Sequence, residues 1–193
     1  MKTRFAVSVL FVLVTAAAFA QSDAAVTQPD AQKSSIAPVP SEGQKSFTSM
    51  KSLAGEWEGP ITVPEAPEMS GGKIHVSLRV TSRGNALVHE LQEAGTPLDA
   101  TKYDHPVTML YLDGDQLTLV HYCDAGNRPR MTGKMSPDGK IVEFELKDIS
   151  GDPEVHMHHS VFTLIDANHH TEDWTFMMQD KPMHAHFDLQ RTK

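Results

Sequence analysis

From Trp57 to the C-terminus, the chain consists of short segments in which apolar and polar residues alternate, separated by turn residues. Residues 74–81 show this most clearly, because every second side chain from Ile74 onward is apolar. Successive side chains of a strand point to opposite faces of a sheet, so the alternation predicts half-buried strands. Glycine in the turn at residues 113–115 can adopt the positive φ of a tight hairpin, and Ser-Pro-Asp-Gly at residues 136–139 is typical of another turn.

About ten segments of this kind can be counted, and no convincing helical period follows Leu53. One or two helical turns are expected before them, over residues 47–53. The predicted fold class is therefore all-β, an antiparallel meander of about ten strands. A long meander of amphipathic strands removes its two edges by closing on itself, so we expect a barrel. A two-sheet β-sandwich is the alternative that the pattern leaves open.

The N-terminus has the features of an export signal. Two basic residues precede an apolar run, and small residues lead up to Ala20. This predicts a cleaved signal peptide at residues 1–20 and a periplasmic or secreted protein without a membrane anchor after cleavage. Residues 21–44 are expected to form a disordered leader, because they contain few apolar side chains to bury. Residues 45–193 then form a single β-barrel domain.

Charge and cysteine content narrow the function. The chain has 17 Lys and Arg against 25 Asp and Glu, and its basic residues do not cluster. Nucleic-acid binding requires a basic face, so no nucleic-acid partner is expected. Cys123 is the only cysteine, so the chain cannot form an internal disulfide, and its core must hold the fold together.

Residues 53–59, Leu-Ala-Gly-Glu-Trp-Glu-Gly, resemble the Gly-x-Trp opening of lipocalins and the Gly-x-Trp-x-Gly of nitrobindin-like haem barrels. In lipocalins a closing Arg packs across this Trp, which implies the same role for Arg191. Residues 109–115, 121–131 and 136–140 look like a family of uncharacterised exported bacterial β-barrel proteins, a domain of unknown function. The resemblance implies a calycin-like barrel and a bacterial origin. It implies no ligand, reaction or catalytic residue.

Two histidines are the leading candidates for a binding site. His89 and His121 each alternate with leucines along their strands, so both are expected to point into the barrel. Tyr111, Arg130 and Trp174 are the other candidate ligand-binding residues. The guanidinium of Arg130 can fork onto a carboxylate, either of a ligand or of an acidic neighbour.

Imidazole nitrogen and thiolate sulfur are ligands of zinc, copper and haem iron, so His89, His121 and Cys123 are candidate metal ligands. Haem or a transition metal is therefore a candidate cofactor, although the spacing matches no recognised metal signature. A structural role is the alternative, with each histidine hydrogen-bonded to a buried partner such as Glu90, Tyr111 or Arg130.

The remaining histidines fall into three groups. Residues 156–159, His-Met-His-His, are expected near a barrel mouth, as a surface metal site, a pH-sensitive rim or simply exposed polar residues. His184 and His186 alternate with apolar residues and are expected to face outward. Residues 169–170 are assigned to a turn.

The first functional hypothesis is the binding of a small, largely apolar molecule inside the barrel. Its expected walls are Leu87, Leu117, Leu119, Phe144, Trp174 and Phe176. The second is a haem or metal barrel, and the third is an enzyme of unidentified reaction. No catalytic residue is assigned, because the sequence contains no Gly-x-Ser-x-Gly, His-Glu-x-x-His, phosphate loop or dinucleotide motif.

Overall fold

The computed structural model of the protein describes residues 39–193. The predicted signal peptide, and the predicted leader up to residue 38, lie outside the described residues. Among the helices of residues 39–193, none is long and apolar enough to cross a membrane.

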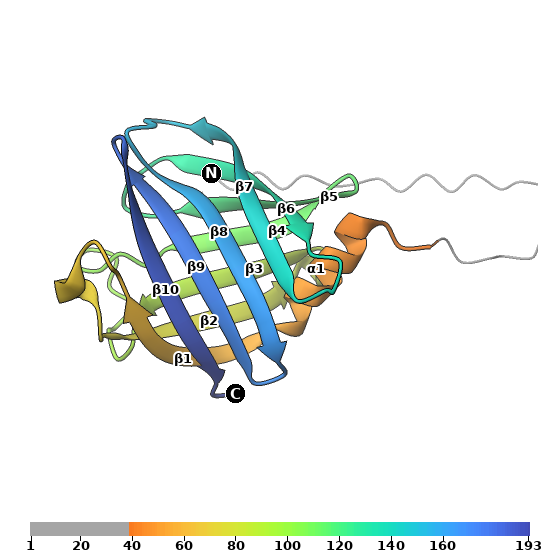
Figure 1. The fold of residues 1–193 in the computed structure, drawn as a ribbon, viewed down its shortest axis with the longest axis horizontal. Helices are drawn as coiled ribbons and strands as arrows, with labels where there is room; N and C mark the ends of the chain where they lie inside the picture. The colour runs from red at the N-terminus through yellow and green to blue at the C-terminus, as the bar shows by residue number, and fades with distance from the viewer. Residues whose placement is uncertain (1–38) are drawn as a thin grey trace, which may run out of the picture. The chain divides into compact units, whose positions relative to one another are not determined.

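Ten strands form one antiparallel sheet that closes into a barrel (Figure 1). They are β1 (Gly55–Thr62), β2 (Lys73–Thr81), β3 (Ala86–Glu93), β4 (Val107–Asp113), β5 (Gln116–Tyr122), β6 (Arg128–Met135), β7 (Ile141–Ser150), β8 (Val155–Asp166), β9 (His169–Met178) and β10 (Lys181–Arg191). Each strand pairs with its neighbours in sequence, and β1 pairs with both β2 and β10. The expected ten-stranded meander is confirmed. Because the sheet is closed, the alternative of a two-sheet sandwich is wrong.

Helix α1 (Glu42–Ser52) precedes β1 and is longer than the one or two turns expected over residues 47–53. The Ser41 side chain accepts a hydrogen bond from the backbone N–H of Gln44, and the Gln44 side chain accepts one from the backbone N–H of Ser41. Such a capping box satisfies two N–H groups at a helix start. For this reason residues 42–44, assigned above to the leader, belong to the helix.

Helix α1 lies at one end of the barrel, and the connection that carries the short helix η1 (Pro67–Met69) lies at the other end (Figure 1). Phe47 and Met50 of α1 are buried in the core. Gly43 rests on the β4–β5 turn so closely that a Cβ would come 1.9 Å from the carbonyl oxygen of Asp115. Helix α1 therefore covers this end. We call the opposite end, formed by the connections at residues 63–72, 94–106, 123–127, 151–154 and 179–180, the mouth.

The barrel core is filled by apolar side chains that are almost completely buried. They include Leu78, Leu87, Leu110, Leu117, Leu119, Phe144 and Phe162. The packing is tight, since a Cβ on Gly133 would come 2.6 Å from the ring of Phe144. Five of the six residues expected to form a ligand wall belong to this core, and the sixth, Phe176, packs against it; the five are Leu87, Leu117, Leu119, Phe144 and Trp174.

Trp57 and Arg191 stabilise the seam between β1 and β10, where they are paired in register. The Cζ atom of Arg191 lies 4.0 Å from the centroid of the Trp57 ring. Arg191 Nη1 donates to the carbonyl of Ala54 at 2.7 Å, and Trp57 Nε1 donates to the carbonyl of Leu53 at 2.8 Å. This is the packing of Arg across Trp that the resemblance to lipocalins implies.

Gly59 lets β1 and β10 approach closely, because a Cβ there would lie 1.7 Å from the backbone carbonyl oxygen of Asp188. We expect Gly59→Ala to lower the free energy of unfolding by about 1–3 kcal/mol, the usual effect of overpacking. Urea unfolding followed by circular dichroism measures this. Gly72→Ala is the matched control, because its Cβ would meet only a methyl group of Ile61, at 3.6 Å. Equal losses in the two variants would contradict the expectation.

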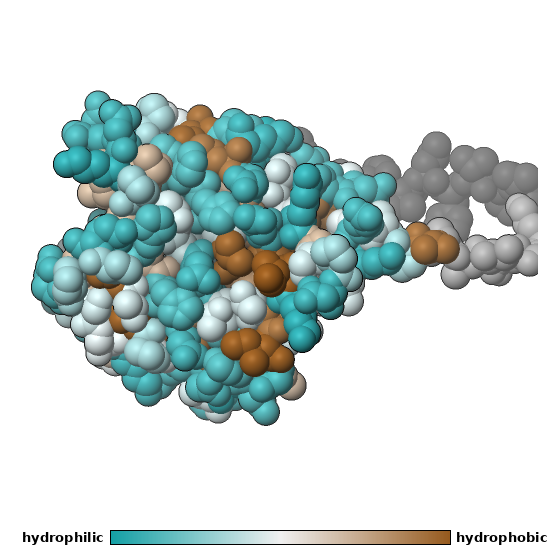
Figure 2. All heavy atoms as spheres, viewed as in Figure 1, coloured by the Kyte–Doolittle hydropathy of each residue, from teal (hydrophilic) through white to brown (hydrophobic). Residues whose placement is uncertain are grey.

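The face of the outer wall seen in Figure 2 is largely hydrophilic. Four outward-facing histidines of the wall each have a carboxylate partner: His159 with Glu143, His169 with Asp188, His184 with Glu65 and His186 with Asp173. The outward orientation expected for His184 and His186 is confirmed. Exposed pairs of this kind contribute little to stability.

Candidate functional site

His89 on β3 and His121 on β5 lie inside the barrel, where they are 1% and 2% exposed. The alternation of side chains along each strand places them on the same face as the core leucines. The indole of Trp174, on β9, lies beside both, with ring centroids 5.4 Å from His89 and 5.7 Å from His121. The structure therefore brings together three of the five residues predicted to bind a ligand.

The carboxylate of Glu172, fully buried on β9, accepts hydrogen bonds from three side chains. His89 Nε2 lies 3.0 Å away, His170 Nε2 3.0 Å and Trp174 Nε1 2.8 Å. An ionised carboxylate can only accept hydrogen bonds, so both imidazoles carry a hydrogen on Nε2. We call Glu172, His89, His170 and Trp174 the carboxylate cluster.

Glu172 is ionised despite its burial. Burial by itself raises the pKa of a carboxyl group, but attraction to His89 and the hydrogen bonds from His170 and His89 outweigh it, so the pKa of Glu172 lies below its ordinary value. Glu172 therefore carries a negative charge inside the barrel at neutral pH.

His121 belongs to a second pair, in which its Nδ1 lies 2.8 Å from Oγ1 of Thr108. Burial, and then the repulsion of His89, lower the pKa of His121 to about 3, so the ring is neutral at physiological pH. Within residues 39–193 the Thr108 side chain has no other hydrogen-bond partner. Its hydroxyl therefore donates to Nδ1, and the hydrogen of the neutral ring is on Nε2.

Four buried histidine ring nitrogens have no hydrogen-bond partner within residues 39–193: His89 Nδ1, His105 Nε2, His121 Nε2 and His170 Nδ1. Buried polar atoms are normally hydrogen-bonded, so each of these needs an explanation. Two of the four, on His89 and His121, belong to the histidines that the alternation pattern points into the barrel.

A cavity of about 50 Å³ lies beside His89 and His121. Its other lining residues are Leu91, Pro106, Met157, Trp174, Phe176 and Phe187. Leu91, Pro106 and Phe176 are half-buried and lie toward the mouth. The cavity is therefore bounded by apolar side chains and the indole of Trp174, with two imidazoles as its ionisable groups. Of the expected ligand wall, only Trp174 and Phe176 line it.

Tyr111 and Arg130 do not line this cavity. Tyr111 is half-buried and lies on the opposite face of β4 from the buried Leu110. Arg130 forks onto the carboxylate of Asp148, with Nε and Nη2 donating at 3.1 and 2.5 Å. The acidic neighbour, rather than a cavity ligand, occupies the guanidinium.

Cys123 follows β5 and is half-buried, and burial raises the pKa of its thiol. It does not line the cavity beside His89 and His121. Within residues 39–193, the three metal-capable side chains whose ligand atoms lie within 4.8 Å of one another are Glu143, Glu145 and His159, on the outer wall. The predicted trio of His89, His121 and Cys123 is therefore not assembled as a three-ligand group.

Residues 156–159 begin β8 and lie at the mouth end, as expected. His156 Nδ1 donates to the carbonyl of Pro153 at 2.7 Å, and its Nε2 lies 3.2 Å from Nδ1 of His158. A bulge follows, between Met157 and His159.

Sequence reasoning missed His170 and Glu172. The assignment of residues 169–170 to a turn is wrong, because β9 begins at His169 and His170 is fully buried. The alternation that places Trp174 inside also places Glu172 and His170 inside. That signal was available, but charged and polar residues on an inward face interrupt the apolar pattern by which strands are recognised.

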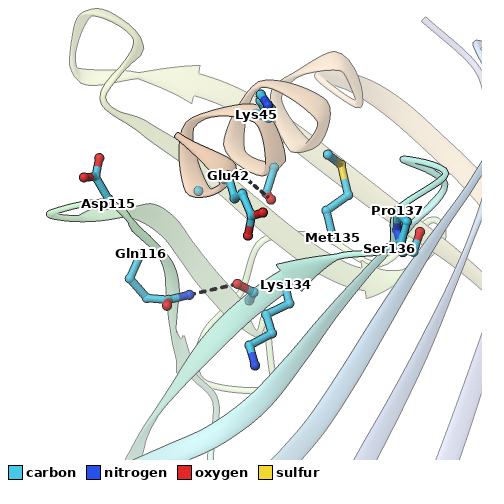
Figure 3. A pocket seen from close by; sticks show the side chains of 11 residues that line it. Glu42, Lys45, Asp115, Gln116, Lys134, Met135, Ser136 and Pro137 are labelled. Atoms are coloured by element: carbon cyan, nitrogen blue, oxygen red, sulfur yellow. Dashed lines mark hydrogen bonds between the residues drawn. The ribbon is translucent and has the colours of Figure 1, made fainter. Parts of the chain in front are cut away.

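A larger open depression, of about 520 Å³, lies between α1 and the β4–β5 and β6–β7 turns (Figure 3). Glu42, Lys45 and Lys134 line it, so its charges are mixed. The Gln116 side chain there donates to the carbonyl of Gly133 at 2.8 Å. None of the buried unpartnered polar atoms found in residues 39–193 belongs to its lining. The cavity beside His89 and His121 is therefore the stronger candidate.

The depressed pKa of His121 has a consequence for stability. The unfolded ring titrates near 6.5, so between pH 6.5 and 3 the unfolded state binds a proton that the folded state does not. This group therefore destabilises the fold on acidification, by up to roughly 1.4 kcal/mol per pH unit. We expect His121→Phe to lose less stability than the unmodified chain between pH 7 and pH 5 in urea unfolding. His186→Ala should lose as much stability between pH 7 and pH 5 as the unmodified chain. Identical losses in all three proteins would refute the attribution of this loss to the lowered pKa of His121.

No family model and no curated protein sequence matches this chain. Among solved structures, the crystal structure of Rv2717c from M. tuberculosis is similar with a TM-score of 0.55 and 17% identity, covering 77% of this chain and 98% of that chain. A protein with unknown function from the DUF3598 family of Nostoc punctiforme PCC 73102 has a TM-score of 0.46 and 8% identity, covering 74% of this chain and 49% of that chain. The likeness to Rv2717c supports the barrel fold alone.

Proposed function

We propose that the protein binds a small, largely apolar molecule in the cavity under the mouth, with His89 and His121 contacting its polar group. One observation carries this proposal: two buried imidazoles, each with a ring nitrogen that has no partner within residues 39–193, line the same otherwise mainly apolar cavity. Ligand sites commonly combine apolar walls with a few polar groups that orient the ligand.

A purely structural role accounts for only half of the hydrogen-bonding capacity of these rings. Glu172 satisfies one nitrogen of His89, and Thr108 satisfies one nitrogen of His121. The partners thereby hold both rings in place. The second nitrogen of each ring remains available, which is the arrangement expected of a preorganised binding site.

The size of the cavity limits its occupant. About 50 Å³ is far below the roughly 300–1,000 Å³ of pockets for drug-sized ligands. The occupant is therefore a slender molecule, or the end of one, whose remainder passes Leu91, Pro106 and Phe176 toward the mouth. These three residues line the cavity and are half-buried, so each also reaches the surface.

Haem or a transition metal is a second candidate, favoured by the hydrogen bond from His89 to Glu172. Metal-ligating histidines usually donate their other ring N–H to a carboxylate or carbonyl, which here leaves His89 Nδ1 as the ligand atom. His121 Nε2 is the second available nitrogen. Structural zinc sites use four protein ligands and catalytic ones three, and the described residues form no three-ligand group here. The fit is therefore poorer than for an organic ligand.

We further propose that the protein acts in the periplasm or outside the cell, which rests on the signal pattern of residues 1–20. Fractionation of an expressing bacterium, with N-terminal sequencing of the exported chain, tests this. Export should yield a mature chain that starts after Ala20.

Native mass spectrometry of the mature protein, combined with an absorption spectrum and metal analysis, tests the binding function. We expect a stoichiometric small organic mass that is lost in Leu91→Trp, because Leu91 lines the cavity and the larger side chain would fill it. Ile165→Trp, at an exposed position, is the matched control and should retain the mass. A Soret band or a stoichiometric metal would favour the second candidate, and retention of the mass in Leu91→Trp would refute this site.

A further inference from the structure

The hydrogen bonds that hold His89 and His121 decide what each ring can offer a ligand. Glu172 occupies Nε2 of His89, so Nδ1 is the available nitrogen of that ring. Thr108 occupies Nδ1 of His121, so Nε2 is available and carries a hydrogen. A ligand thus meets a donor on His121. On His89 it meets a nitrogen that accepts when the ring is neutral and donates when the ring is protonated.

A carboxyl group matches this pair in both states of His89. One oxygen accepts the hydrogen bond from Nε2–H of His121. The other oxygen shares a single proton with Nδ1 of His89, as a carboxylic acid on a neutral ring or as a carboxylate on an imidazolium. Both arrangements contain the same number of protons. A hydroxyl group both accepts and donates only against the neutral ring, and an ester has no hydrogen to donate.

The dimensions of the cavity favour the end of an aliphatic chain. An apolar cavity of about 150 Å³ is known to hold benzene, and the cavity here is about a third of that volume. An aromatic ring is therefore too large, whereas a carboxyl group with the first carbon of its chain is of suitable size. The rest of a linear chain can follow the apolar side chains of Leu91, Pro106 and Phe176 to the mouth.

The charges around the cavity require that a proton accompany the carboxylate. Among the described residues, no Lys or Arg lines the cavity. The titratable groups in and behind its wall are His89, His121, His170 and Glu172, and Glu172 already holds a negative charge. A second bare carboxylate would be strongly unfavourable in this buried environment. A proton shared with Nδ1 of His89 offsets the charge of the carboxylate.

We propose that the ligand is a slender aliphatic monocarboxylic acid, bound carboxyl group first between His89 and His121. This inference rests on the proposed function, because it names the class of molecule that the cavity binds. The carboxyl group then lies at the inner end of the cavity, and the aliphatic chain extends from it toward the mouth.

Isothermal titration calorimetry of the mature protein with octanoate, 1-octanol and methyl octanoate tests the inference. We expect octanoate to bind at least about tenfold more tightly than methyl octanoate, because the ester cannot donate a hydrogen bond. 1-Octanol should bind more weakly than octanoate, because its hydroxyl group matches the pair only when His89 is neutral.

Two histidine variants locate the carboxyl group. His121→Phe should weaken octanoate binding at least about tenfold and should weaken methyl octanoate as well, because a carbonyl oxygen of either compound accepts from Nε2–H, while His186→Ala, on the outer wall, should change neither. If His121→Phe does not fold, the comparison of ligands on the unmodified protein decides alone. Equal affinities for octanoate and its ester would overturn the monocarboxylate and leave the proposed apolar binding intact. Failure of all three compounds to bind would also overturn it, and native mass spectrometry then judges the proposed function separately.

Discussion

Glu172→Ala is expected to lower the free energy of unfolding by about 3–5 kcal/mol, the usual effect of removing one partner from a buried charged pair. The carboxylate is completely buried and accepts hydrogen bonds from His89, His170 and Trp174. Alanine would leave three buried N–H groups without an acceptor. It would also remove the charge that balances any proton on the two imidazoles.

Urea unfolding at pH 7, followed by circular dichroism, measures this loss. The free energy of unfolding of Glu172→Gln should fall between those of the unmodified chain and the alanine variant. Its amide keeps one acceptor oxygen, but its NH₂ group faces the N–H groups of the neighbouring side chains and cannot accept from them. Glu143→Ala is the matched control, since Glu143 also bonds a histidine, His159, but on the exposed outer wall. A Glu172→Ala protein as stable as Glu143→Ala would disprove the role of the carboxylate cluster.

Trp57→Ala should have an effect of similar size, a loss of about 3–5 kcal/mol in the free energy of unfolding. The indole is 0% exposed at the seam that closes the barrel. The guanidinium of Arg191 covers its ring, and His170 lies 4.2 Å away, centroid to centroid, in an edge-to-face arrangement. Alanine would leave a large void beside the seam of β1 and β10. It would also expose the backbone hydrogen bonds that pair these two strands and close the barrel.

Thermal and urea unfolding of a graded series test this expectation. Trp57→Phe keeps an aromatic ring but loses the hydrogen bond to the carbonyl of Leu53, so its loss should be clearly smaller. Ile165→Ala, at an exposed apolar position, is the control for truncation itself and should change little. If Trp57→Ala and Trp57→Phe unfold at the same urea concentration, packing at the seam does not stabilise the barrel.

Several features of the site were accessible from the chain because they depend on local periodicity. The alternation of side chains placed His89, His121 and Trp174 inside before any contact was known, and their burial agrees with it. The same rule extends to His170 and Glu172. An inward-facing carboxylate such as Glu172 is unexpected from sequence, because charged residues are rarely buried without partners, and its three donors are known only from the structure.

Other features depend on partners that are distant in sequence. Arg130 lies 18 residues from Asp148, and only the β6–β7 register brings the two side chains together on the outer wall. Glu172 lies 83 residues from His89, across the interior of the closed barrel. A sequence pattern gives the face of a strand but not which side chains meet across the barrel, so neither pair could be predicted.

By itself, the sequence determined the strands, their antiparallel order and the inward face of several of them, because alternation and turn residues act over a few residues. It favoured closure of the sheet, because ten amphipathic strands leave two edges otherwise, but it left a two-sheet sandwich open. Only the tertiary structure decided how much of the interior is filled, which histidine nitrogens remain without partners, and that a buried carboxylate orients one of them. These properties follow from packing and hydrogen bonds between strands far apart in the chain, which no local pattern encodes.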